Sequence, residues 1–152
     1  MYATTRSPRE REIAARSNIS NDLANALLTA VVESSHDAIA SKTLDGIVTS
    51  WNRSAEGLFG YTAEEMIGQP IAILAAPGRE NEMPMILERI RRGERVDHFE
   101  TVRRRKDGSL VEIALTVSPI RDQRGQIVGA SKIARDIMGR QQAEQAAGSP
   151  GA

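Results

Sequence analysis

The fold of this chain is decided by the stretch Trp51-Asn52-Arg53-Ser54-Ala55-Glu56-Gly57-Leu58-Phe59-Gly60-Tyr61. Its first residue ends a run, 47–51, that is rich in strand-forming residue types. Asn52 belongs to the residue types that cap helices, because its side-chain oxygen can accept an amide hydrogen bond. Gly60 suits the left-handed conformation that often ends a helix. The stretch therefore predicts a strand that passes directly into a short helix.

Turn and capping signals divide the chain on both sides of this stretch. Asp45-Gly46 separates the run 38–42 from 47–51 and predicts a hairpin. Thr62 and Glu65 fit a capping box for a second short helix, and a third is expected from Asn81 to about Arg92. Strand-like runs follow at 96–104, 110–119 and 127–137. This order predicts an α+β domain, in which short helices cover one face of an antiparallel sheet.

The composition limits the classes of function. The chain has 152 residues, of which 40% are hydrophobic and 26% charged, and its formal net charge is zero. A neutral chain gives no reason to expect a nucleic-acid partner. No apolar run approaches membrane-spanning length, so we expect no membrane partner and a cytoplasmic location. The chain has 0 cysteines, which excludes disulfides and cysteine metal sites, and we expect no metal.

The flanking segments are expected to differ from the globular part. Residues 1–18 are polar and predicted to be disordered. Residues 19–34 carry apolar residues at helical spacing and predict an amphipathic helix. The globular domain is expected at 35–138, and 139–152 to be a helix start followed by a flexible tail. A short apolar stripe needs a partner surface, which is either the open face of the sheet or the same helix of a second chain. We expect the second, a homodimer formed through Leu23, Leu27 and Val31.

The globular part resembles the PAS family of sensor domains over roughly residues 35–138. Seven short motifs in order carry the resemblance: Asp45-Gly46, Trp51-Asn52, Ala55-Glu56, Phe59-Gly60-Tyr61, Glu65-Met66-Ile67-Gly68, Arg105-Lys106-Asp107-Gly108-Ser109 and Arg135-Asp136-Ile137. The resemblance implies the PAS fold, with five antiparallel strands, a helical layer and a cavity between them. It puts the strand 38–42 at the centre of the sheet, beside 47–51 and 127–137.

The resemblance also implies a non-enzymatic sensory or interaction module in signal transduction. Such a module responds to a small ligand or a protein partner and acts on an output domain such as a histidine kinase. Two alternatives stay open: a constitutive dimerisation module with a filled core, and a haem-binding gas or redox sensor. The sequence identifies neither the ligand nor the partner, and the chain can be a piece of a longer receptor.

The expected cavity lies between the helices and the strand 110–119. If it exists, its lining is apolar and predicts a hydrophobic ligand; otherwise the same residues fill the core. A covalent flavin is excluded because the run 68–74 has no cysteine, and the absence of histidine from the helix 82–92 does not favour haem. The candidate lining residues are Met66, Leu74, Met83, Leu87, Ile90, Ile113, Leu115 and Val117.

Few polar residues suggest chemistry. Ser34-Ser35-His36-Asp37 contains residue types of hydrolase triads, but neighbours on an extended segment point to opposite faces, so we expect no catalytic site. The basic run Arg103-Arg104-Arg105-Lys106 is interpreted as a solvated strand end. In some members of the family that this chain resembles, a glutamate like Glu56 pairs with a base like Lys106, which would give both residues, with Asn52, a structural role. The alternative is that Glu56 is an exposed carboxylate that contributes little to stability.

Overall fold

The computed structural model describes residues 7–138, and it describes the helix path but not the side chains of residues 12–21. The predicted helix start and tail at 139–152 lie outside the described residues. The chain divides after Ser34 into two compact units, and each is described by itself.

The first unit is a single helix, α1, at Pro8–Ser34. Its start is a capping box, because the Ser7 hydroxyl accepts the amide hydrogen of Glu10 at 3.2 Å and the Glu10 carboxylate accepts that of Ser7 at 3.0 Å. Pro8 occupies the first helical position, where its missing amide hydrogen does no harm. The prediction of disorder over 1–18 is therefore wrong for residues 8–18, and residues 1–6 are not described.

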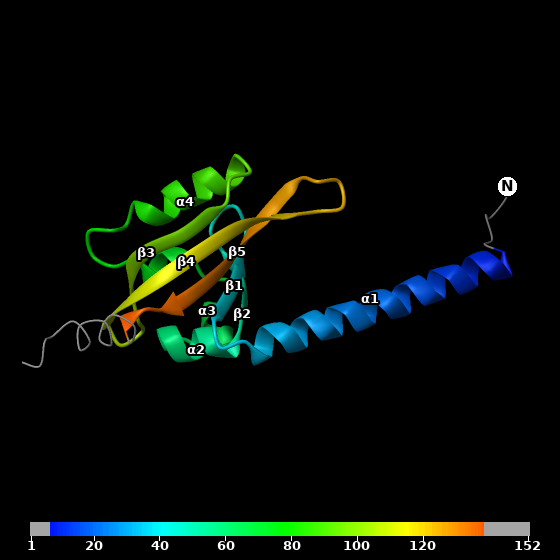
Figure 1. The fold of residues 1–152 in the computed structure, drawn as a ribbon, viewed down its shortest axis with the longest axis horizontal. Coiled ribbons are helices and arrows are strands. Elements are labelled where there is room, and N and C mark those ends of the chain that lie inside the picture. The colour runs from blue at the N-terminus through cyan, green and yellow to red at the C-terminus, as the bar shows by residue number, and fades with distance from the viewer. Residues whose placement is uncertain (1–6, 139–152) are drawn as a thin grey trace, which may run out of the picture. The chain divides into compact units, whose positions relative to one another are not determined.

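Up to residue 138, where the described part ends, the second unit contains five strands and four short helices (Figure 1). The sheet order is β2-β1-β5-β4-β3, and every neighbouring pair is antiparallel. This confirms the predicted fold and the neighbours of β1, although β5 takes the central place. The elements are β1 (Ala38–Lys42), β2 (Val48–Trp51), α2 (Arg53–Phe59), α3 (Ala63–Met66), the 3-10 helix η1 (Ile71–Leu74), α4 (Glu82–Arg91), β3 (Val96–Arg104), β4 (Leu110–Arg121) and β5 (Ile127–Asp136).

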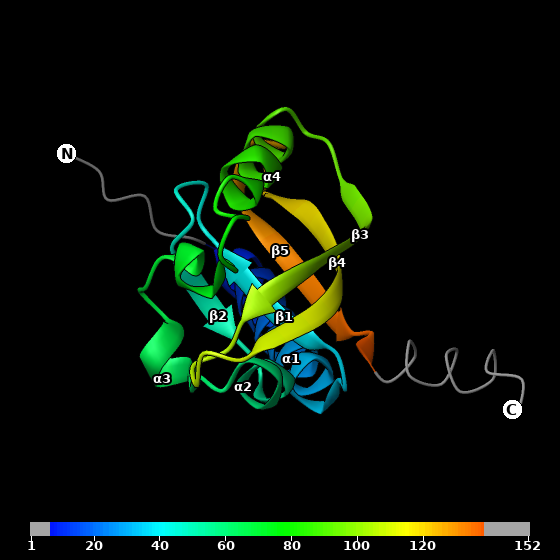
Figure 2. The same cartoon turned by 90° about the vertical axis from the view of Figure 1, so that its left-hand side faces the viewer.

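The core lies between the sheet and the short helices. On β4, alternate residues from Val111 to Val117 are buried, as the sequence pattern predicts. They share one hydrophobic core with the buried face of α4, which includes Met83, Ile86 and Ile90. Figure 2 shows α4 at one end of the helical layer and α2 and α3 at the other.

The junction between β2 and α2 depends on Asn52, which is 1% exposed. Its side-chain oxygen accepts the amide hydrogens of Ala55 and Ile39, both at 2.9 Å, and its amide nitrogen donates to the Asp37 carbonyl at 3.1 Å. The bond to Ala55 confirms the predicted helix cap. The other two bonds join the start of β1 to the same side chain, which the sequence did not predict.

Replacing Asn52 by alanine should lower the free energy of unfolding by about 2 kcal/mol, because one buried and two partly buried backbone groups lose their partner together. Thr62→Ala is the matched control, since Thr62 caps α3 at an exposed position and an ordinary cap contributes about 1 kcal/mol. Urea denaturation measures both. Equal losses in the two variants would show that the bonds to β1 contribute nothing.

Candidate functional site

The structure separates the eight predicted lining residues into two groups. All eight are buried. Met83 and Leu87, on α4, border an open cleft. The other six lie within the packed core, each at most 1% exposed: Met66, Leu74, Ile90, Ile113, Leu115 and Val117.

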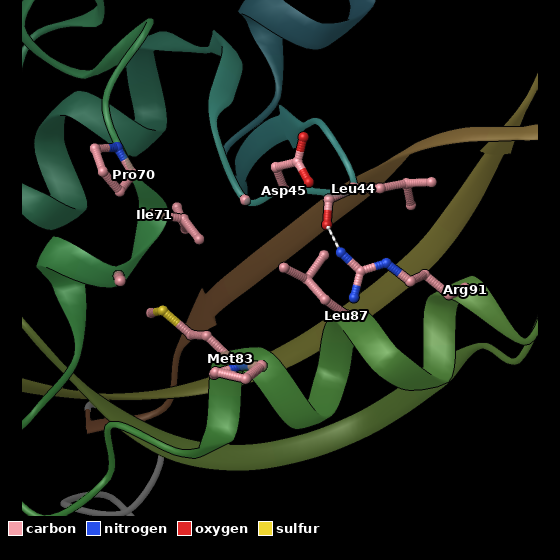
Figure 3. A pocket seen from close by; sticks show the side chains of 10 residues that line it. Leu44, Asp45, Pro70, Ile71, Met83, Leu87 and Arg91 are labelled. Atoms are coloured by element: carbon pink, nitrogen blue, oxygen red, sulfur yellow. Dashed lines mark hydrogen bonds between the residues drawn. The ribbon is translucent and has the colours of Figure 1, made fainter.

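The cleft has a volume of about 290 Å³ and lies between α4, η1 and the β1–β2 turn (Figure 3). Its walls are mostly apolar, and Asp45 and Arg91 supply its charged groups. One Arg91 Nη2 hydrogen bond crosses the cleft to the Leu44 carbonyl, with a length of 2.5 Å. The cleft is lined by Leu44, Asp45, Gly46, Pro70, Ile71, Ala72, Met83, Pro84, Leu87 and Arg91.

Gly46 allows the conformation of the turn where it borders α4. Its φ is +85°, a conformation that other residues rarely adopt, and a Cβ there would lie 3.4 Å from Leu87 Cδ1. The turn predicted from Asp45-Gly46 therefore forms one wall of the cleft as well as joining two strands.

Arg103 is the most unexpected residue of the interior. Its side chain is fully buried, so the interpretation of the basic run as a solvated strand end is wrong for this residue. The alternation of β3 turns Thr101 and Arg103 inward. Arg103 Nη1 forms an ion pair of 2.7 Å with Glu82, in the first turn of α4, and Thr101 donates to the same Glu82 oxygen at 2.6 Å.

The Arg103–Glu82 pair leaves part of the guanidinium unsatisfied. Within residues 7–138, neither Nε nor Nη2 of Arg103 has a hydrogen-bond partner, and both atoms are buried. Burial lowers the pKa of Arg103, and Glu82 partly opposes this. Burial raises the pKa of Glu82, but hydrogen bonds from Thr101 and Arg103 outweigh it, so the net shift is downward.

Two lysines share this interior with Arg103. Lys42 on β1 and Lys132 on β5 are 4% and 3% exposed, and neither forms an ion pair with any described carboxylate. Burial, with the charge of Arg103, lowers the pKa of Lys42 to about 8. Burial, then the charges of Lys42 and Arg103, hold the pKa of Lys132 well below its ordinary value. The Lys132 ammonium lies 5.0 Å from the centre of the Phe59 ring.

Sequence reasoning missed these lysines. The strand alternation does indicate their burial. Lys42 is two residues after Ala40 and four after Ala38, so it points to the same face of β1, and Lys132 likewise shares a face of β5 with Ala130 and Ala134. We define the buried cation cluster as Lys42, Arg103 and Lys132.

The predicted pairing of Glu56 with Lys106 is wrong. Lys106 forms its ion pair with Glu65, and Glu56 instead accepts the amide hydrogen of Ala63 at 2.7 Å. Glu65 lies in the first turn of α3, and its ion pair with Lys106 joins this helix to the turn between β3 and β4. The Glu56 and Glu65 carboxylates both bind groups in or next to the α2–α3 region. Glu56 and Lys106 therefore each make a structural contact, although not with one another.

Among the side chains described, no three histidine, aspartate or glutamate residues come together as metal ligands. Within the described residues, no helix is both long and apolar enough to cross a membrane.

Comparisons with known proteins agree with this geometry. The family model described as PAS fold matches residues 26–137. Two-component system protein A of Emericella nidulans is 40% identical over 101 residues, and the histidine-protein kinase AtoS of Escherichia coli is 26% identical over 115. These matches cover 65% and 76% of the chain but only 14% and 18% of the relatives' length. A crystal structure of a Colwellia psychrerythraea PAS domain gives a TM-score of 0.70 at 30% identity, covering 76% of this chain and 98% of that one.

The buried lysines predict a pH dependence of stability. Between about 8, the folded pKa of Lys42, and about 10.4, its unfolded value, the unfolded state binds more protons, so the free energy of unfolding rises with pH. Below pH 8 the penalty for the buried charge is fully present and constant. Lys42→Met should therefore stabilise the domain at pH 7 and reduce the rise between pH 8 and 10, leaving the part that belongs to Lys132.

Chemical denaturation at a series of pH values measures this effect. Lys106→Met is the control, because Lys106 is exposed and its removal should leave the alkaline rise unchanged. Superimposable profiles of Lys42→Met and the unmodified protein above pH 7 would show that Lys42 is not held out of water.

Proposed function

We propose that this chain, which belongs to the PAS family, is the non-enzymatic sensory module of a two-component signalling protein. Its similarity to a two-component protein and to a histidine kinase supports a histidine kinase as the output partner. The chain spans less than a fifth of either relative, so the output domain belongs to the proposal.

The observation that carries this function is the cleft beside α4. Its walls belong to different parts of the domain, namely a helix that packs on the sheet and the turn between β1 and β2. The Arg91–Leu44 hydrogen bond joins the two walls across the opening. A small ligand or a partner that prefers one separation of these walls shifts the population toward that arrangement.

A constitutive dimerisation module is the second candidate. The six predicted lining residues that lie within the packed core favour it, because a filled core needs no ligand. Haem is supported less, since α4 contains no histidine to ligate its iron. The sensory module and the dimerisation module are both expected to form a homodimer.

The proposed dimer surface is the apolar stripe of α1. Leu23, Leu27 and Val31 recur every fourth residue and are 70%, 63% and 56% exposed. A second copy of this helix would remove that apolar surface from water, which supports a homodimer through α1.

Leu27→Glu should convert the dimer to a monomer, because a buried charge in an apolar seam has no partner. Asn25→Glu adds the same residue on the opposite side of α1 and should leave the dimer intact. Sedimentation velocity measures both masses. A dimer that survives Leu27→Glu would reject this surface.

The proposed sensory function predicts that the backbone hydrogen bonds of α4 open independently of those of the sheet. Arg91→Ala should speed amide exchange in α4 and in residues 44–47 by roughly twofold to tenfold, the range expected for the loss of one hydrogen bond. Exchange in β4 and β5 should not change. Arg89→Ala is the control, because Arg89 lies on α4 and pairs with Glu94 rather than across the cleft.

Hydrogen exchange of the full chain, followed by mass spectrometry, gives this measurement. If α4 exchanges together with the sheet in both proteins, the domain is a rigid interaction module and the sensory proposal fails.

A further inference from the structure

The interior of the domain holds more positive than negative charge. Lys42, Arg103 and Lys132 reach it from three different strands, and each is at most 4% exposed. Glu82 is the carboxylate that pairs with Arg103, and its second oxygen is already bound by Arg79 at 3.1 Å. Among the described residues, no further carboxylate forms an ion pair with the cation cluster.

The unsatisfied atoms of Arg103 have a specific arrangement. Nη1 is occupied by Glu82 at 2.7 Å and by the Val102 carbonyl at 3.0 Å. Nε and Nη2 form the other edge of the guanidinium, where two N–H groups point in parallel. This fork matches the two oxygens of one carboxylate or phosphate group.

The surrounding residues do not compensate these charges. Burying a cation is unfavourable unless an anion or full hydrogen bonding accompanies it. The Phe59 ring offers Lys132 a weak attraction, and a water molecule would bring no negative charge. An anion that bridges Arg103 and the two lysines would satisfy the fork and offset part of the positive charge of the cluster.

We propose that the interior of this domain binds a small organic carboxylate, with its oxygens on the free edge of Arg103 and beside Lys42 and Lys132. This inference rests on the proposed sensory function and names its ligand class. The apolar core around the cluster suits a carbon skeleton better than a strongly hydrated phosphate. The apolar ligand predicted from the sequence does not account for the cations.

The cleft beside α4 is the proposed route of entry. Lys42 precedes Leu44 of the cleft wall by two residues, and Glu82 directly precedes Met83. Met83 is a flexible side chain that can move aside for a ligand. A ligand that binds Arg103 would also change its ion pair with Glu82, which lies in the first turn of α4.

Isothermal titration calorimetry on the full chain tests the ligand class with four probes. Glutarate and pentanoate supply two and one carboxylates, pentanamide is the neutral counterpart of pentanoate, and inorganic phosphate is the competing anion. We expect a carboxylate to bind and to raise the melting temperature, and pentanamide to do neither. If no carboxylate binds at millimolar concentrations, or phosphate alone binds, the proposal is overturned.

Lys132→Met tests the site, because its two effects should have opposite signs. The variant should melt at a higher temperature without ligand, since a buried charge is removed, yet bind the carboxylate roughly tenfold more weakly. Lys106→Met replaces an exposed lysine. It should change the melting temperature less than Lys132→Met does, and it should leave the affinity for the carboxylate unchanged. Unchanged affinity in Lys132→Met would overturn the site.

Proton uptake supplies a second readout. A bound anion raises the pKa of both lysines, so binding at pH 8 should take up protons, and affinity should fall as the pH rises further. Calorimetry in buffers of different ionisation enthalpy measures this uptake, which Lys42→Met should reduce. Binding without proton uptake would contradict the cluster.

The outcomes separate this inference from the proposed function. Independent opening of α4 without carboxylate binding would keep the sensory function and reject the ligand class. Carboxylate binding by a domain in which α4 and the sheet exchange together would keep the anion site and reject the sensor.

Discussion

The alternation of side chains along a strand is the constraint on which the rest of this domain depends. It fixes which residues of each strand face the helices, whatever their polarity. On β1, β3 and β5 that parity includes Lys42, Arg103 and Lys132 as well as apolar residues. The interior therefore has to accommodate charge within a hydrophobic core. Burial and the neighbouring cations lower the pKa values of the two lysines.

Glu82 connects this buried charge to the helical layer. It begins α4 and receives hydrogen bonds from Thr101 and Arg103 on the far edge strand, so the position of α4 is set partly by an ion pair and partly by apolar packing. The pair joins Arg103 Nη1 to one Glu82 oxygen, so it fixes the start of α4 at a single point on β3.

The two ends of the sheet domain are also tied by polar contacts. Asp37, just before β1, forms two hydrogen bonds with the guanidinium of Arg135 near the end of β5, at 3.0 and 3.2 Å. The Asp37 carbonyl is in turn bound by Asn52. The residues just before β1, the start of α2 and the end of β5 are therefore joined by one network of polar contacts.

The sequence by itself determined the local elements and the family. Asn52, Gly60 and the Thr62–Glu65 box form the predicted caps, because capping depends on residues a few positions apart. Tertiary structure alone decided that Lys106 pairs with Glu65 and that Arg103 meets Glu82, Lys42 and Lys132. Those groups lie far apart in the chain, and only the strand order and the packing of α4 bring them together.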